Sequence, residues 1–254
     1  MKTLFLKLNF FLLTTLSLGI IVISIFIYYA HTSINFYNYL IKIYNTNLLT
    51  LVNKFFIFNI GVIGSIWTYI NYKRTNNIQF VFFYCFICSY ILEPIAIFKY
   101  YLLSNTLSLE LYFFMKFYHL IVIFSLLNLF FLSLYICDFQ IKSITYAIYL
   151  IFTFSMIYSY LIPINTYQNT NNFLSPIGEN KFYVYLFLLL ILINFLVACL
   201  RKKNLSYFLL FISISSIILG TYLNFTEMPY EFIPILIGVP IYLKEAGKLF
   251  FYWL

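Results

Sequence analysis

Charged residues are scarce in this chain of 254 residues. Asp, Glu, Lys and Arg together make up 9% of it, whereas about 25% is usual in a soluble globular domain. Hydrophobic residues account for 64%. This composition excludes an ordinary soluble domain. It predicts a membrane protein, in which each spanning segment satisfies its own backbone hydrogen bonds as a helix.

The sequence also lacks the short motifs that carry well-known chemistry. It contains no P-loop, no G-x-G-x-x-G, no H-E-x-x-H and no G-x-S-x-G pattern. It has only seven glycines, and none of them forms a G-x-x-x-G pair. We therefore predict no catalytic residues and no enzymatic activity of the chain's own.

Residues that could hold a metal or a haem are few. Cys85 and Cys88 form a C-x-x-C pair, but a zinc site would need two further soft ligands nearby, so we interpret them as small buried apolar side chains. His31 and His119 fall at different depths of their predicted helices, whereas a membrane haem held by two histidines needs them to face each other. We expect neither a metal nor a cofactor.

Long apolar runs, by contrast, are abundant. Eight segments are each close to the ~20 residues that a helix needs to cross a bilayer. They cover roughly 8–30, 50–72, 78–98, 110–136, 142–163, 182–200, 205–224 and 230–247. The chain therefore predicts one all-α domain over 1–254, a polytopic bundle of about eight transmembrane helices. The first run is longer than the apolar region of a cleavable signal peptide, which favours a retained helix.

Basic residues fall at alternate ends of these runs. They precede the first run and follow the second, fourth, sixth and eighth: Lys2, Lys7, Lys73, Arg74, Lys142, Arg201, Lys202, Lys203, Lys244 and Lys248. Loops rich in Lys and Arg stay on the side from which the chain is inserted, which is the cytoplasm or the matrix and is called the inner side below. Both termini are therefore predicted on the inner side. Orientation also accounts for the net charge of +8, and we expect no nucleic-acid partner.

The predicted connections differ on the two sides. On the outer side, segment 31–49 is aromatic and amphipathic and is expected to lie along the membrane surface, whereas 164–180 is a polar loop. On the inner side, short turns begin near 73, 137 and 201, which is a spacing of 64 residues in each case (137 − 73 and 201 − 137). This spacing suggests that the helix pairs around these turns are copies of one hairpin.

Ionisable residues within a span are candidates for function, because charge is costly there. Glu93 and Lys116 each lie about six residues from the loop that joins their helices, which places both about 9 Å below the helix ends. We predict that they pair, either as a structural ion pair or as part of a proton or ion site. His119 lies one turn from Lys116 on the same face. It either extends the pair into a relay or packs as a hydrogen-bonded core residue.

Other polar or irregular positions also lie within the spans. Three asparagines are expected to make hydrogen bonds between helices: Asn59, Asn128 and Asn194. The last helix is predicted to be irregular because it contains Glu231, Pro234, Gly238 and Pro240. It is either a kinked packing helix or a broken helix that opens backbone groups for binding.

Phe (32 residues) and Tyr (26 residues) are very frequent, and Asn, Ile and Lys are common. Over the whole chain this composition resembles that of mitochondrially encoded membrane proteins of ciliate-type protists. The resemblance implies a non-catalytic subunit of a respiratory-chain or ATP synthase complex in the mitochondrial inner membrane, giving structural and assembly support. Its partners would be other membrane subunits and lipids such as cardiolipin. The lipid headgroups would lie near the basic turns at Lys73, Arg74, Arg201, Lys202 and Lys203.

Two other functions remain open. A helix followed by seven more, with short basic inner turns, is similar to the membrane region of bacterial seven-helix signalling receptors. Such a sensor would lie in the bacterial inner membrane and would act through a separate output partner. Alternatively, Glu93, Lys116, His119 and the irregular last helix would form the site of a small ion or solute transporter.

Overall fold

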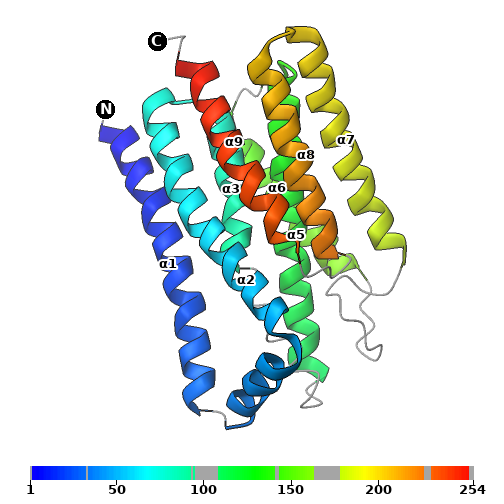
Figure 1. The fold of residues 1–254 in the computed structure, drawn as a ribbon. Coiled ribbons are helices and arrows are strands. Elements are labelled where there is room, and N and C mark those ends of the chain that lie inside the picture. The colour runs from blue at the N-terminus through cyan, green and yellow to red at the C-terminus, as the bar shows by residue number, and fades with distance from the viewer. Residues whose placement is uncertain are drawn as a thin grey trace.

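The computed structural model describes residues 2–32, 34–92, 94, 108–140, 143–162, 178–225 and 230–251. Its long elements over these residues are eight α-helices, labelled as in Figure 1. They are α1 (Lys2–Thr32), α2 (Ile34–Thr75), α3 (Ile78–Leu92), α5 (Ser108–Ile136), α6 (Ile144–Leu161), α7 (Gly178–Lys202), α8 (Leu205–Phe225) and α9 (Phe232–Phe251).

The helices are long and apolar, as the hydrophobic runs predict. Over the described residues, five stretches are long and apolar enough to cross a membrane: Leu51–Thr75, Met115–Ile136, Ile144–Leu161, Phe182–Lys202 and Leu205–Tyr222. Shorter apolar stretches lie in α1 and α3, at Leu13–Tyr28 and Ile78–Leu92. The predicted fold class is thus confirmed as all-helical, with helices of the kind that integral membrane proteins contain.

The helix boundaries differ from the predicted ones mainly on the outer side. Because α2 begins at Ile34, most of segment 31–49 is helical and continuous with the span that follows it. Figure 1 shows these first turns of α2 at the lower edge of the bundle, bent away from the rest of the helix. The predicted helix 78–98 corresponds to α3, which ends at Leu92. Residues 95–107 and 163–177 lie outside the described part of the chain.

The helices run alternately up and down the bundle around α3. This central helix packs against α1, α2 and α5, and ten of its fifteen residues are buried. Helix α9 packs against α2 and α8, whereas α6 and α7 both pack on α5 at one edge of the bundle. Helix α1 begins and α9 ends at the same end, shown uppermost in Figure 1, as an arrangement with both termini on one side of a membrane requires.

Helices α8 and α9 approach each other closely at two glycines. A Cβ atom on Gly238 would lie 2.6 Å from the backbone oxygen of Ser213, and one on Gly220 would lie 2.8 Å from the backbone oxygen of Glu231. Small residues let helix backbones approach in this way, which increases van der Waals contact between helices. The predicted irregularity of the last helix is present as Pro240 inside α9, which removes one backbone donor without ending the helix.

Two inner turns share the same local geometry. Asn76 and Lys203 have the left-handed backbone conformation, with φ of 49° and 46°. The side-chain oxygen of the asparagine that follows each of them accepts the backbone N–H two residues further on, at 3.0 Å from Gln79 and 3.1 Å from Ser206. This N-terminal cap begins the next helix at once. The α2–α3 and α7–α8 turns are therefore alike in detail, while the repeat of whole hairpins stays a prediction.

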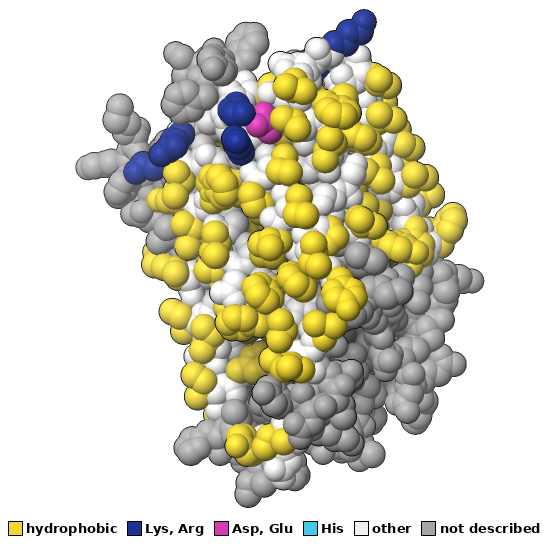
Figure 2. Space-filling model, in the orientation of Figure 1, with side chains coloured by type: hydrophobic (Ala, Val, Ile, Leu, Met, Phe, Trp, Pro, Cys, Tyr) yellow, Lys and Arg dark blue, Asp and Glu magenta, His cyan; other side chains and the backbone are white. Residues whose placement is uncertain are grey.

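The charges on the described surface lie mainly at the inner end. Figure 2 shows Lys and Arg side chains at the upper end of the visible face and many hydrophobic side chains over the described area below. Asp138, in the turn after α5, pairs with Lys202 at 2.7 Å and with Arg201 at 3.6 Å. Lys73 and Arg74, in the last turn of α2, are exposed at the same end. This distribution is the one that the alternating basic residues predict.

Candidate functional site: a buried polar cluster between α2 and α9

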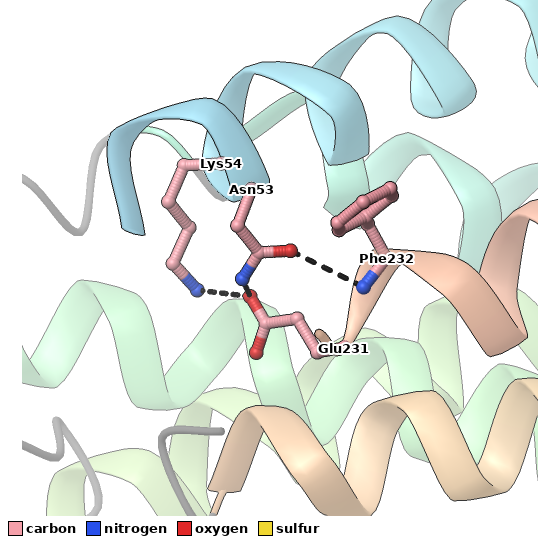
Figure 3. Close-up of polar contacts among 4 residues, drawn as sticks. All are labelled: Asn53, Lys54, Glu231 and Phe232. Atoms are coloured by element: carbon pink, nitrogen blue, oxygen red, sulfur yellow. Dashed lines mark hydrogen bonds and ion pairs between the residues drawn. The ribbon is translucent and has the colours of Figure 1, made fainter. Parts of the chain in front are cut away.

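A buried carboxylate joins the start of α9 to α2, near the beginning of the apolar stretch Leu51–Thr75. Glu231, directly before α9, is 1% exposed. Its Oε1 atom accepts hydrogen bonds from the side-chain amide of Asn53 at 2.6 Å and from the ammonium of Lys54 at 2.9 Å. Figure 3 shows both donors reaching from one turn of α2 towards this one oxygen. The cluster therefore contains a matched pair of opposite charges away from solvent.

The same cluster caps the first turn of α9. The side-chain oxygen of Asn53 accepts the backbone N–H of Phe232 at 3.2 Å, as Figure 3 shows. This N–H is one of the donors that the start of a helix leaves without a partner inside the helix. The carboxylate of Glu231 also lies at the positive end of the helix dipole. Phe56 stacks on Phe232 with 4.9 Å between ring centroids, so polar and aromatic contacts act at the same point.

The arrangement is a structural ion pair that links α2 to the start of α9. A buried carboxylate alone can bind a proton or a cation, but here Lys54 supplies the counter-charge at hydrogen-bond distance. Removing one partner of a buried pair leaves an uncompensated charge, which is strongly destabilising. The cluster therefore holds the start of α9 against the middle of α2.

Among the described residues, Lys116 contacts the end of α6, which the sequence did not predict. Its ammonium donates hydrogen bonds to the backbone oxygens of Ser159 (3.0 Å), Tyr160 (2.7 Å) and Ile162, at the end of α6. In return, the Ser159 hydroxyl donates to the backbone oxygen of Lys116 at 2.6 Å. A cation at this position satisfies helix carbonyls and complements the negative end of the helix dipole. Glu93 lies outside the described residues, so its pairing with Lys116 stays a prediction.

His119 is fully buried one turn along α5 from Lys116. Burial alone does not distinguish its two predicted roles, a hydrogen-bonded core residue and a member of a relay. A Glu93–Lys116–His119 relay would need Glu93 and stays a prediction as well.

The three asparagines within spans behave differently from one another. Asn194 of α7 donates to the hydroxyl of Ser133 on α5 at 2.9 Å, which confirms the predicted hydrogen bond between helices. Asn59 and Asn128 instead donate to the backbone oxygens of Phe55 and Phe124, four residues back in their own helices. For these two amide donors, the expectation of a partner on another helix is wrong, because a carbonyl of the preceding turn is closer.

The sequence did not predict the Lys54–Glu231 pair. Glu231 was notable only as a mark of irregularity in the last helix, and Lys54 lies at the outer edge of a span, where lysine is common. The pattern that could have predicted this pair is the adjacent Asn53-Lys54 at the start of a predicted span. A donor and a cation at that depth require an acceptor on another helix, because buried polar groups are hydrogen-bonded.

Within the described ranges, no group of three or more His, Cys, Asp or Glu side chains is placed to hold a metal ion. Comparison of the chain with known proteins found no matching family model, no matching curated protein and no matching solved structure.

Proposed function

We propose that this protein is a non-catalytic membrane subunit of a larger energy-transducing complex, of the respiratory chain or the ATP synthase, in the mitochondrial inner membrane. Its role is to give structural and assembly support. The observation that carries the proposal is the exposure of α6. Of its eighteen residues, only Ile151, Ser155 and Ser159 are buried, in a single stripe that faces α5.

The remaining surface of α6 is aromatic as well as aliphatic. Tyr146 and Tyr160 are each 79% exposed, and Leu161 is 70% exposed. Tyrosine and phenylalanine are enriched where proteins meet, because they supply a large contact area with few rotatable bonds. In a bilayer, helices associate through van der Waals packing, and α6 packs extensively on one helix of the described chain only. A helix of a neighbouring subunit against α6 would complete this packing.

The basic inner end supports the same proposal. Lys73, Arg74, Lys202 and Lys203 lie at the inner helix ends, where anionic headgroups of lipids such as cardiolipin would meet them. Arg201 lies beside them and shares Asp138 with Lys202. In this proposal the inner side is the matrix.

Native electrophoresis after gentle detergent extraction tests the proposal, with mass spectrometry of the band. The expected result is migration far above the 30.4 kDa of the chain, together with known respiratory-chain or ATP synthase subunits. Migration alone or as a small homo-oligomer would exclude the proposal. A second test uses Leu150→Ala and Tyr146→Ala on the exposed face of α6, which are expected to release the subunit from the assembly. The control is Leu219→Ala on the exposed face of α8, which should leave the subunit in place.

A small ion or solute transporter is the second candidate. The observation that favours it is the buried Lys54–Glu231 pair beside a helix that contains Pro240. In a reconstituted transporter, Glu231→Gln would abolish flux even when unfolding measurements show that the variant is folded. A subunit of a complex would show no flux with either form.

A further inference from the structure

An apolar groove lies between α6 and α7, which both pack on α5 without packing extensively on each other. It encloses about 220 Å³. Its floor includes Ile123 and Leu127 of α5, one wall includes Phe154 and Tyr158 of α6, and the other includes Tyr183 and Phe187 of α7. Tyr158 and Tyr183 meet edge to face across the groove, with 6.4 Å between ring centroids.

The chemistry of the groove excludes polar occupants. Its lining surface is entirely apolar. An apolar cavity of about 150 Å³ inside a protein stays dry and accepts apolar molecules, and this groove is larger. Water, ions and polar solutes would find no hydrogen-bonding partner there. The occupant is therefore apolar at this depth.

The size and position of the groove exclude a whole helix. The lining residues cover five positions on each helix, which is about 6 Å along its axis (four rises). A helix with its side chains is about 10–12 Å wide, so 6 Å of its length occupies at least about 470 Å³, more than twice the volume of the groove. Tyr158 lies three residues before the end of α6, and Tyr183 lies five residues after the start of α7, so both walls are in the outer half of their helices. The floor residues lie near the middle of α5, so the groove reaches from the outer half to the middle of the bundle. At that depth in a bilayer, the abundant slender apolar groups are lipid chains.

A positive charge lies on the outer side of the groove. Lys116 is seven residues, about two helical turns, before Ile123 on α5, which places both on one face of the helix. No carboxylate within the described residues pairs with it. Its three N–H donors bind carbonyl oxygens of the α6 end, so its attraction for a phosphate acts through charge.

We propose that this groove holds one acyl chain of a phospholipid from the outer leaflet, with the phosphate end of the lipid towards Lys116. The proposal requires only that the helices span a membrane, and it does not depend on membership of a complex. If the chain did belong to a complex, this lipid would fill the space between α6 and α7 beside the neighbouring subunit.

Photolabelling of the reconstituted full chain tests the proposal. The probe is a phosphatidylglycerol with a diazirine in one acyl chain, diluted into phosphatidylcholine vesicles, and adducts are mapped by mass spectrometry. We expect adducts concentrated at residues 154–158 and 183–187. Leu127→Trp places a larger side chain in the groove floor, which leaves less space for the acyl chain. It should reduce these adducts about tenfold, which corresponds to a loss of about 1.4 kcal/mol in the binding free energy of the lipid. Leu150→Trp, on the exposed face of α6, should leave them unchanged.

Two outcomes would overturn the proposal. One is an even spread of adducts over the exposed apolar faces of all helices, and the other is full labelling in a folded groove-filling variant. Val184→Phe, on the α7 wall, replaces Leu127→Trp if that variant does not fold. In native membranes, a photoreactive residue at Phe187 that captures a protein partner and no lipid would also exclude a lipid occupant. The results in vesicles do not depend on whether the chain migrates with a large complex.

Discussion

Glu231 illustrates how one side chain organises two helices. Its carboxylate accepts hydrogen bonds from two adjacent residues of α2. One of these, Asn53, also accepts a hydrogen bond from the first backbone N–H of α9. Both charges are nearly enclosed, since the side chains of Lys54 and Glu231 are 11% and 2% exposed. In such surroundings each charge depends on the other for its stability.

Glu231→Gln and Lys54→Met should therefore each lower the free energy of unfolding by about 3 kcal/mol, because each leaves one buried charge without its partner. The double variant should lose less than the sum of the two, since neither charge then remains. Chemical denaturation of the purified protein in detergent measures this. The control is Lys244→Met, an exposed residue of α9, for which a change within about 0.5 kcal/mol is expected. If the loss of unfolding free energy in the double variant equalled the sum of the two single losses, Lys54 and Glu231 would not stabilise each other.

Lys116 controls the end of α6 through backbone contacts. In Lys116→Met, three carbonyl oxygens lose their donor, and we expect amide hydrogen exchange in the last turn of α6 to become at least about tenfold faster. Exchange in α8 should stay unchanged. Equal exchange in the variant and the unmodified protein would show that these hydrogen bonds contribute nothing to the end of α6.

At the scale of elements, α8 and α9 approach each other closely, and their glycines make this approach possible. Gly238→Ala would bring a Cβ atom to 2.6 Å from a backbone oxygen, which cannot move aside as a flexible side chain can. We expect a loss of about 1–3 kcal/mol in unfolding free energy. The matched control is Gly19→Ala in α1, where nothing lies within 4 Å. There the change should be neutral or stabilise the helix by about 0.5–1 kcal/mol.

The sequence predicted the helices better than their partners. Long apolar runs give the position of a span directly, because the bilayer requires a minimum length of apolar residues. Side-chain partners depend on how each helix is rotated about its own axis and packed against its neighbours. Because the runs are apolar on all sides, the sequence pattern does not predict which face of a helix points inward. The sequence therefore predicted that Lys116 lies within a helix and missed its contact with the end of α6. The extension of the second helix back to Ile34 was missed because segment 31–49 mixes polar and aromatic residues.

At the scale of the whole molecule, the start of α1, the end of α9 and the basic last turns of α2 and α7 lie at one end of the bundle. The same end holds the three left-handed turn residues that the structure describes, Asn76, Asp138 and Lys203. In membrane proteins, short loops that are flanked by Lys and Arg stay on the side that is not translocated. The fold brings these groups to one end of the bundle, and the charge pattern predicts that this end is the inner side.

Cysteine labelling in sealed membranes tests this orientation. With a membrane-impermeant maleimide, Lys73→Cys and Lys203→Cys should react only from the inner side. Asn172→Cys, in the predicted outer loop, should react only from the outer side. Burial raises the pKa of the native Cys137 thiol, and the nearby Asp138 raises it further, so its thiolate is scarce and its background labelling should be slow. Labelling of Lys73→Cys and Lys203→Cys from opposite sides would refute the bundle, since α3, α5, α6 and α7 return the chain to the same end between these two turns.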